Sequence, residues 1–436
     1  MRATTTWHKH GPQANCGIST SRPDQTDGHV GSARGVNWPA VTFSLMLAIY
    51  SIAIIWPSAI TPAEYDAELG SIVFGGSERI SMIYTLAGTV ALLLGSVGTI
   101  ASRSSRLFGQ AYGEFLFVIG IILYSVAWLF IYISVPTAPM QLAQLVLTMF
   151  VYLGFVCAWY LPRAKILKGL ALVSYVVAGC LIGALLLNGL PENRWVGGIH
   201  PNFFARFAWV AFALHSLSLR RISRIGLLGC TIASFIVSTR TILVGEVFFL
   251  LLYFMVAVTN ARQRRVAVLS AVLVSGVVAI GILIVLFSGY STYIITWFTD
   301  ALELTSSVRG VTSGFTGRTE VWSSFFDRLP EFVAFGAGFR SVRYQDYVIH
   351  NGFLTYFVDF GLPMGLVVVS AVATKIVYVI RKSVLHHDNL GSLAGCLAAA
   401  SLLMQFSEPD NFNIGFLGSV LFMLLLAFQP RHVRQV

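Results

Sequence analysis

The chain has 436 residues, of which 56% are hydrophobic and only 11% charged, and its mean hydropathy is +0.75. This composition excludes a water-soluble globular domain and is typical of a protein that crosses a membrane many times. The net charge of +10 is explained by basic residues kept on one side of the membrane and by attraction to anionic lipids. No nucleic-acid partner is therefore expected.

The first 38 residues are polar and lack the apolar core of a cleavable signal peptide, so residues 1–38 are predicted to be a disordered cytoplasmic tail. The spacing of His8, His10 and Cys16 in this tail matches no structural zinc pattern. Each remaining cysteine stands alone in a predicted helix, where cysteine behaves as a small apolar residue: Cys157, Cys180, Cys230 and Cys396. No disulfide framework is implied.

Apolar runs of about 17 to 22 residues, long enough to cross a hydrocarbon core of roughly 30 Å as helices, recur along the chain. They predict an all-α fold, a polytopic membrane helical bundle of about twelve transmembrane helices. The predicted spans are 39–57, 80–101, 115–135, 141–161, 169–189, 203–219, 222–239, 241–259, 266–288, 362–380, 391–406 and 412–429.

The basic residues predict the orientation, because loops rich in Lys and Arg stay in the cytoplasm. With the N-terminus inside, the inner segments hold 19 of the 29 basic residues. These are Arg2, Lys9, Arg22, Arg34, Arg103, Arg106, Arg163, Lys165, Lys168, Arg220, Arg221, Arg224, Arg262, Arg264, Arg265, Arg381, Lys382, Arg431 and Arg434. Both termini are therefore predicted to be cytoplasmic.

The predicted helices form two groups separated by one long outer loop. Residues 39–288 hold helices one to nine, residues 289–350 form a periplasmic loop subdomain, and residues 351–429 hold helices ten to twelve. Residues 430–436 form a short cytoplasmic tail.

Within the loop, Trp322, Phe325, Phe326 and Leu329 recur at helical spacing and predict an amphipathic helix that ends at Pro330. On the outer membrane surface this helix could cover a cavity for a lipid-anchored substrate. The alternative is a purely structural interfacial helix.

The same loop contains an arginine suited to binding phosphate. Arg318 and Trp322 are one helical turn apart, so the guanidinium can stack on the indole and be held in place. A planar guanidinium binds pyrophosphate oxygens in pairs, and converging arginines can neutralise a leaving pyrophosphate without a metal. The alternative for Arg318 is a solvated ion pair with Glu320.

Two further arginines are predicted at the same membrane face. Arg240, in Ser238-Thr239-Arg240-Thr241, falls between two helices with no room for a hydrated loop. Arg206 follows Pro201, which is well placed to open a helix. An arginine deep in lipid costs about 2.5 to 3.5 kcal/mol, so each is expected to face a polar interior, with snorkelling to the interface as the alternative.

Titratable residues complete the candidate site. His350 stands where a helix begins and could accept a proton from a sugar hydroxyl, or could merely cap that helix. Asp359 and Glu408 could serve as a base or an arginine partner, whereas Glu246 is expected to be structural. The acidic segment Glu64–Glu68 in the first outer loop is insufficient for a hard cation.

The order of these motifs resembles that of a known family. Five features follow one another before a Gly-rich helix: Ser238-Thr239-Arg240-Thr241, the long outer loop, Gly317-Arg318 with Trp322, Gly336-Ala337-Gly338, and His350-Asn351. This order is similar to that of the bacterial O-antigen ligase and the O-antigen and exopolysaccharide polymerase superfamily of integral membrane glycosyltransferases. The resemblance covers roughly residues 198–410 and includes the Pro201-Asn202 pair.

The resemblance implies an enzyme of the inner membrane that takes a glycan from undecaprenyl pyrophosphate at the periplasmic face and needs no cofactor or metal. It implies His350, Arg318 and Arg240 as catalytic residues. The residues expected to bind substrate are Arg206, Asn202, Trp322, Asn351 and Arg340. Arg309, Arg340 and Arg343 remain rivals of Arg318 within the loop.

The acceptor distinguishes the members of this superfamily. A polymerase adds repeat units to a growing glycan, whereas a ligase joins a finished polymer to the lipid A core. The segment Gly361–Gly365 slightly favours a polymerase. Other expected partners are membrane lipids and a chain-length regulator protein. A secondary transporter or lipid-linked oligosaccharide flippase is the alternative of another class, although such proteins usually show two similar halves.

Overall fold

The computed structural model describes residues 36–60, 63–66, 71–74, 78–131, 137–191, 194–259, 296, 323, 325–339, 351–405 and 412–430. Its helices are α1 (Trp38–Ile60), α2 (Glu78–Gly109), α3 (Tyr112–Ile131), α4 (Ala138–Ala158), α5 (Arg163–Asn188), α6 (Pro201–Leu219), α7 (Arg224–Ile236), α8 (Arg240–Thr259), α12 (Leu329–Phe332), α13 (Gly352–Leu385), α14 (Asn389–Met404) and α15 (Leu417–Leu426). Two strands, β1 (Ala63–Asp66) and β2 (Ser71–Phe74), complete the described elements.

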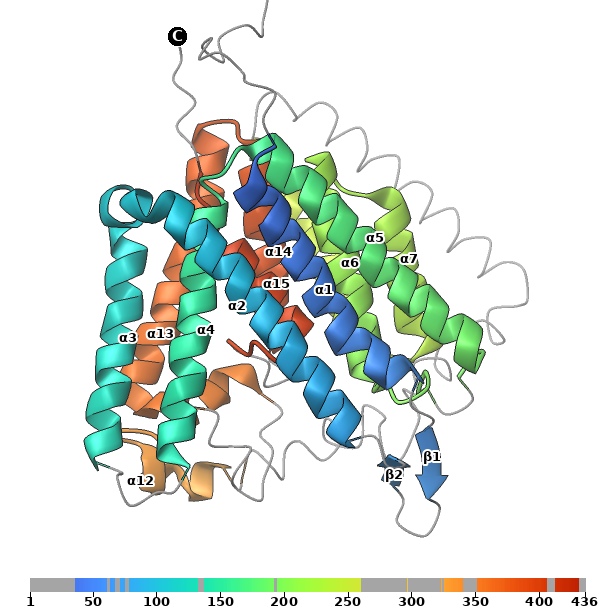
Figure 1. The fold of residues 1–436 in the computed structure, drawn as a ribbon, viewed down its shortest axis with the longest axis horizontal. Coiled ribbons are helices and arrows are strands. Elements are labelled where there is room, and N and C mark those ends of the chain that lie inside the picture. The colour runs from blue at the N-terminus through green and yellow to red at the C-terminus, as the bar shows by residue number, and fades with distance from the viewer. Residues whose placement is uncertain are drawn as a thin grey trace, which may run out of the picture. The chain divides into compact units, whose positions relative to one another are not determined.

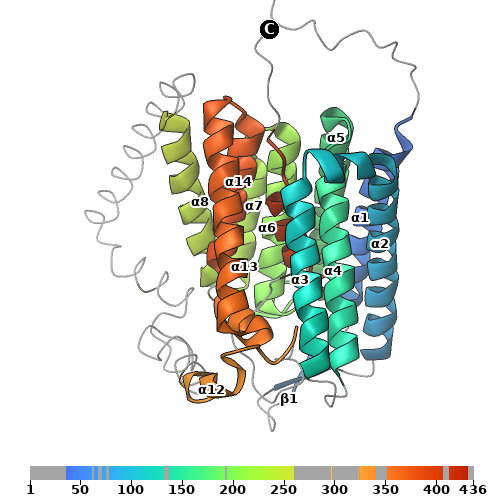
Figure 2. The same cartoon turned by 90° about the vertical axis from the view of Figure 1, so that its left-hand side faces the viewer.

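The long helices form an antiparallel bundle (Figures 1 and 2). α1 packs on α2 and α5, α5 packs on α6, and α13 packs on α14. We call one end of the bundle the α12 end: there α1, α3, α5, α7 and α14 finish and α2, α4, α6, α8, α13 and α15 begin. The other end is the opposite end.

Seven described helices are long and apolar enough to cross a membrane: α1, α2 from Met82, α3, α4, α5, α8 and α13. The chain is therefore that of a multi-pass membrane protein. The described helices also include α7, α14 and α15, which are apolar but shorter, with 13, 16 and 10 residues. The predicted span 266–288 lies outside the described residues, so the count of twelve stays a prediction.

The predicted all-α fold class is confirmed over the described residues, which also include one short β hairpin that the sequence did not predict. β1 and β2 pair antiparallel between α1 and α2, with Ala63 opposite Phe74 and Asp66 opposite Ser71. The acidic residues Glu64 and Asp66, in the segment that the sequence shows to be insufficient for a hard cation, lie in the first strand. The pairing satisfies backbone groups in the loop, which a helix-based prediction does not anticipate.

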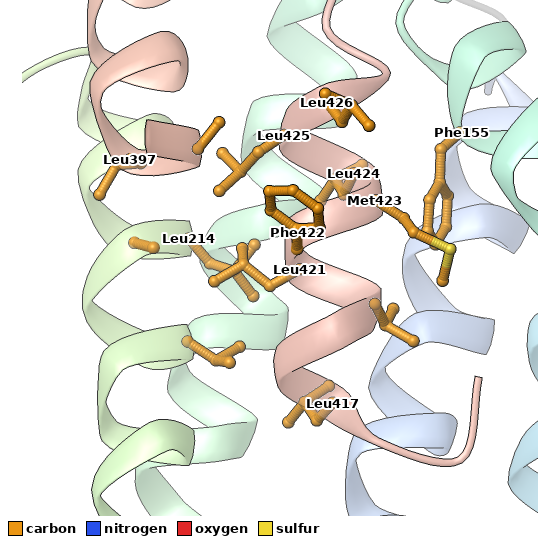
Figure 3. Close-up of a cluster of buried hydrophobic side chains, with 14 of the residues drawn as sticks. Phe155, Leu214, Leu397, Leu417, Leu421, Phe422, Met423, Leu424, Leu425 and Leu426 are labelled. Carbon is orange, nitrogen blue, oxygen red and sulfur yellow. The ribbon is translucent and has the colours of Figure 1, made fainter. Parts of the chain in front are cut away.

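Helix α15 is the centre of the core (Figure 3). Nine of its ten residues are buried, and Phe155 of α4, Leu214 of α6 and Leu397 of α14 lie around it. The indole nitrogen of Trp159 donates a hydrogen bond to the Leu424 carbonyl oxygen at 2.9 Å. A helix that is apolar on all sides is enclosed by protein, which explains why α15 need not have the length of a lipid-exposed span.

Basic residues concentrate at the opposite end. Of the 16 Lys and Arg residues that the structure describes, 11 lie there: Arg103, Arg106, Arg163, Lys165, Lys168, Arg220, Arg221, Arg224, Lys375, Arg381 and Lys382. The other five are Arg79, Arg194, Arg206, Arg240 and Arg328. This asymmetry is the one that the predicted orientation requires.

An ion pair toward the opposite end fixes α3 to α13. Lys375 pairs with one carboxylate oxygen of Glu114, and the Tyr152 hydroxyl of α4 donates a hydrogen bond to the other. The Lys375 and Glu114 side chains are each 14% exposed. We expect Lys375→Met to lower the free energy of unfolding by about 3 kcal/mol, because it leaves a largely buried carboxylate without its cation. An SDS titration in detergent micelles measures this loss.

Lys168→Met is the matched control, since Lys168 is exposed on α5 near the same end. The double substitution Glu114→Leu with Lys375→Met should recover most of the stability, because it removes both charges. If Lys168→Met and Lys375→Met lowered the free energy of unfolding equally, the Lys375–Glu114 ion pair would not be the cause of the loss.

Candidate functional site at the α12 end

The most deeply buried large polar side chains gather at one end of the bundle. Among the described residues, the buried side chains with an amide, carboxyl or guanidinium group all lie in the half nearer the α12 end: Gln141, Arg206, Glu246, Asn351, Asp359, Gln405 and Asn413. Among the described residues, the polar side chains buried as deeply in the other half are serines and threonines. Burying larger polar groups costs more, so their concentration marks the α12 end as the candidate site.

Helix α6 begins as the sequence predicted. Pro201 is its first residue, and the Nδ1 atom of the capping residue His200 accepts a hydrogen bond from the Asn202 backbone nitrogen at 3.2 Å. The His200 ring also packs edge-on against Trp195, with ring centroids 4.9 Å apart. Asn202, predicted to bind substrate, is half-buried in the first turn. These contacts fix the direction in which α6 enters the bundle.

Arg206 lies one turn further into α6 and is only 6% exposed. Its guanidinium carbon is 5.6 Å from the centroid of the Phe416 ring, and that ring lies 4.9 Å from the ring of Phe203. The cation therefore contacts the face of an aromatic ring inside the bundle. The prediction that Arg206 faces the interior and not the lipid is confirmed.

Arg240 is the first residue of α8 and is half-buried. α7 ends only four residues earlier, at Ile236, so the predicted lack of a hydrated loop is confirmed. Since α6 packs on both α7 and α8, Arg206 in the second turn of α6 and Arg240 in the first turn of α8 lie on two packed helices at the same end.

Arg194 stabilises this turn, and the sequence analysis missed it. Its Nε atom donates to the Val237 carbonyl oxygen at 3.0 Å, and a terminal guanidinium nitrogen donates to the Ser238 carbonyl oxygen at 2.7 Å. A cation at the C-terminus of α7 satisfies carbonyl groups there and complements the helix dipole. No local pattern around Arg194 announces these contacts, because the partners are more than 40 residues away.

Asn351 caps the N-terminus of α13. Its side-chain oxygen accepts hydrogen bonds from the backbone nitrogens of Phe353 at 2.9 Å and Leu354 at 3.0 Å. We expect Asn351→Ala to lower the free energy of unfolding by about 1 kcal/mol, and Asn351→Ser to keep most of it, because serine also caps helices. Denaturant titrations of the purified variants compare the two. Equal losses would show that the cap is not the source of the effect.

The first part of α13 carries polar groups into the bundle. Tyr356 and Asp359 are 2% and 5% exposed, and the Tyr356 ring lies 6.1 Å from that of Phe412. Asp359 also lines a cavity of about 10 Å³ together with Gln141, whose side-chain oxygen has no hydrogen-bond partner within the described structure. A cavity of this size has room for a single water molecule.

The amphipathic helix predicted in the loop is confirmed only in part. Phe325 is buried, but Phe326 is 59% exposed, so the apolar stripe is narrower than predicted. The expectation that Pro330 ends this helix is wrong: the helix breaks at Arg328, and Pro330 lies in the first turn of α12. Proline fits there because the first helical nitrogens need no intrahelical acceptor.

Arg328 pairs with Glu331 on the exposed face of α12, with a nitrogen to oxygen distance of 2.9 Å. The hydrogen bond from Arg328 holds the pKa of the Glu331 carboxyl below its ordinary value. Arg328 is thus engaged by a neighbour on its own surface.

Several predicted site residues lie outside the described residues: His350, Arg318, Trp322, Arg340, Arg309, Arg343 and Glu408. Their roles stay predictions. Glu246 is buried and accepts a hydrogen bond from Thr231 at 2.8 Å, consistent with a structural role. No group of three or more potential metal ligands occurs in the part of the chain that the structure describes.

Comparison of the sequence with known proteins gives no match, either among protein-family models or among curated proteins.

Proposed function

We propose that this protein is a membrane glycosyltransferase that uses a saccharide linked to undecaprenyl pyrophosphate. The observation that carries the proposal is Arg206, a guanidinium buried against Phe416 at the polar end of the bundle, with Arg240 on the neighbouring helix α8. Two arginines near the N-terminal ends of packed helices suit a pyrophosphate, since the cations attract an anion and the helix dipoles favour one at that end.

In this mechanism Arg206 and Arg240, joined by Arg318 of the loop, bind the pyrophosphate and stabilise its negative charge as the bond to the sugar breaks. His350 removes the proton from the acceptor hydroxyl, whose oxygen attacks the anomeric carbon from the opposite face. Such a single displacement inverts the anomeric configuration. No metal takes part in the step.

For the orientation, we propose that the α12 end faces the periplasm and that both termini lie in the cytoplasm of a bacterial inner membrane. The 11 basic residues at the opposite end support this, because basic segments are retained in the cytoplasm. Single cysteines at exposed Leu190 and Arg221, labelled in intact cells with an impermeant maleimide, test the orientation. Only the label at position 190 is expected to react.

Transfer is tested with the purified protein in liposomes that contain an undecaprenyl-pyrophosphate-linked oligosaccharide and EDTA. We favour a polymerase, so we expect longer glycans and released undecaprenyl pyrophosphate, both measured by mass spectrometry. In parallel, lipid A core is offered as acceptor, and a product on that lipid alone would identify a ligase. Movement of the lipid-linked oligosaccharide between leaflets without a new glycosidic bond would identify a flippase and refute the proposal.

A further inference from the structure

Helix α13 is broken near the site, and a loop segment pairs with the break. At Gly361 the backbone leaves the helical conformation, which separates a half-helix, Gly352–Phe360, from the long remainder of α13. Three backbone hydrogen bonds join this break to residues 333–338: Leu362 nitrogen to Val333 oxygen at 2.8 Å, Ala337 nitrogen to Val358 oxygen at 2.6 Å, and Gly338 nitrogen to Asp359 oxygen at 3.2 Å. The direction of the half-helix therefore depends on a segment that precedes α13 in the chain.

Two glycines make this pairing possible. Gly336 and Gly361 both have positive φ, +77° and +75°. A Cβ atom on Gly336 would lie 2.5 Å from the Gly361 backbone nitrogen, and one on Gly361 would lie 2.7 Å from the Ala334 carbonyl oxygen. Any side chain at either position would force the segments apart. The Gly336-Ala337-Gly338 motif thus serves a close backbone approach.

Two side chains of helix α3 form hydrogen bonds to the paired segments, that is, to the end of the half-helix and to the segment before α13. The Tyr124 hydroxyl lies 2.6 Å from the Phe360 carbonyl oxygen and 3.2 Å from the Phe335 carbonyl oxygen, so its single proton is shared between the two segments. The Trp128 indole nitrogen donates to the Gly336 carbonyl oxygen at 3.3 Å. We call Tyr124, Trp128, Gly336 and Gly361 the α3 clamp.

The half-helix and the arginines belong to separate elements of the site. Tyr356 of the half-helix packs near Phe412, in the segment that continues to Phe416 and so to Arg206. Arg206 and Arg240 belong to α6 and α8, and no clamp residue lies on either helix. In the sequence, the half-helix directly follows Asn351 and the base proposed for the acceptor, His350.

We propose that the α3 clamp sets the direction of the half-helix Gly352–Phe360 and thereby positions the acceptor side of the transfer site. This inference rests on the proposed function for its kinetic consequence but not for its structural one. Tyr124 and Trp128 are positioning residues, since they act through the backbone of the half-helix and of the segment before α13. Loosening the clamp should slow the attack step and leave donor binding unchanged.

The first experiment tests the direction of the half-helix with two spin labels. One replaces Phe353 on the half-helix, and the other replaces Leu190, a residue after α5 that is 75% exposed. Cys16 is replaced by serine, and the remaining four cysteines are buried. Double electron–electron resonance measures the distance between the two labels. In the protein with an unaltered clamp it should give one narrow distance distribution. Gly361→Ala and Tyr124→Phe should shift or broaden it, whereas Tyr175→Phe, which removes an exposed hydroxyl from α5, should not.

The second experiment measures the rate of glycosyl transfer by the same clamp variants without spin labels. Tyr124→Phe should lower kcat about tenfold and Gly361→Ala about 10²-fold, the loss typical of a 1 Å misplacement, with the donor KM within about twofold of wild type. Tyr124→Phe removes a single oxygen atom, so it keeps the test valid if Gly361→Ala fails to fold.

An unchanged distance distribution in Tyr124→Phe and Gly361→Ala would overturn the clamp, whatever the activity. A changed distribution with wild-type kcat would overturn the positioning role while leaving the glycosyltransferase proposal intact. Conversely, if the wild-type protein transfers no sugar, the proposed function fails and the positioning role with it, and the distance measurement still decides whether the clamp sets the half-helix.

Discussion

Replacing Arg206 by methionine is expected to lower the rate of glycosyl transfer by about 10²- to 10³-fold, the cost of removing one preorganised donor from a developing negative charge. Methionine keeps an unbranched apolar side chain against Phe416 and removes only the charge and the donors, so the loss reports chemistry more than packing. Arg240→Ala is expected to fall in the same range. Transfer is measured with purified variants in liposomes at equal protein.

Lysine should restore little activity at either position, because an ammonium group lacks the planar pair of donors that fits pyrophosphate. Arg328→Met is the matched control at the same end, since Arg328 is exposed and paired with Glu331 on α12. Arg221→Ala controls for the loss of a positive charge at the opposite end. Wild-type rates in Arg206→Met would assign Arg206 to packing and remove the observation on which the proposed function rests.

The local features of the site could be predicted because each is encoded within a few residues. Pro201 opens α6 as predicted, and α13 begins directly after the predicted helix start at His350-Asn351, although the residue that caps it is Asn351, which was predicted only to bind substrate. Arg240 must begin a helix because two apolar runs meet there without a loop. Propensity and hydropathy are sums over such short windows, so they describe helix ends and spans well.

The features that join distant segments could not be predicted in this way. Arg194 bonds carbonyl groups at positions 237 and 238, and Gly336 meets Gly361 across a break in α13. The Gly336-Ala337-Gly338 motif could be recognised in the sequence, but its position there indicates a part of the catalytic loop and not a site of close backbone packing. Only the fold shows what a Cβ atom at these glycines would strike, because the neighbours come from elsewhere in the chain.

The burial of short helices could not be predicted from the sequence either. A run such as α15 predicts a lipid-crossing helix by composition, yet nine of its ten residues are buried among neighbours that include α4, α6 and α14. Hydropathy measures how apolar a segment is and not whether lipid or protein surrounds it. For the same reason Phe325 and Phe326, adjacent and equally apolar, differ in the structure, one buried and the other exposed.

Replacing His350 by alanine should produce the largest loss, up to about 10⁴-fold, because general-base assistance is typically worth 10² to 10⁴ in rate. Only the neutral imidazole can accept the proton, so kcat/KM of the wild type should rise with pH through about 6.5, the ordinary pKa of histidine. His350→Gln should retain some activity if the residue also orients the acceptor by a hydrogen bond, but this pH-dependent limb should vanish. A pH series with the purified enzyme measures both effects.

The control for His350 is His386→Ala, at the opposite end of α13, which should leave the rate and its pH dependence unchanged. The stereochemistry of the product gives an independent test of the step that the base assists. Attack by the activated hydroxyl on the face opposite the pyrophosphate inverts the anomeric centre, which NMR coupling constants of donor and product reveal. Retention of configuration would exclude a single displacement. A wild-type rate in His350→Ala would remove the base assignment even if inversion were found, because the arginines alone would then account for the catalysis.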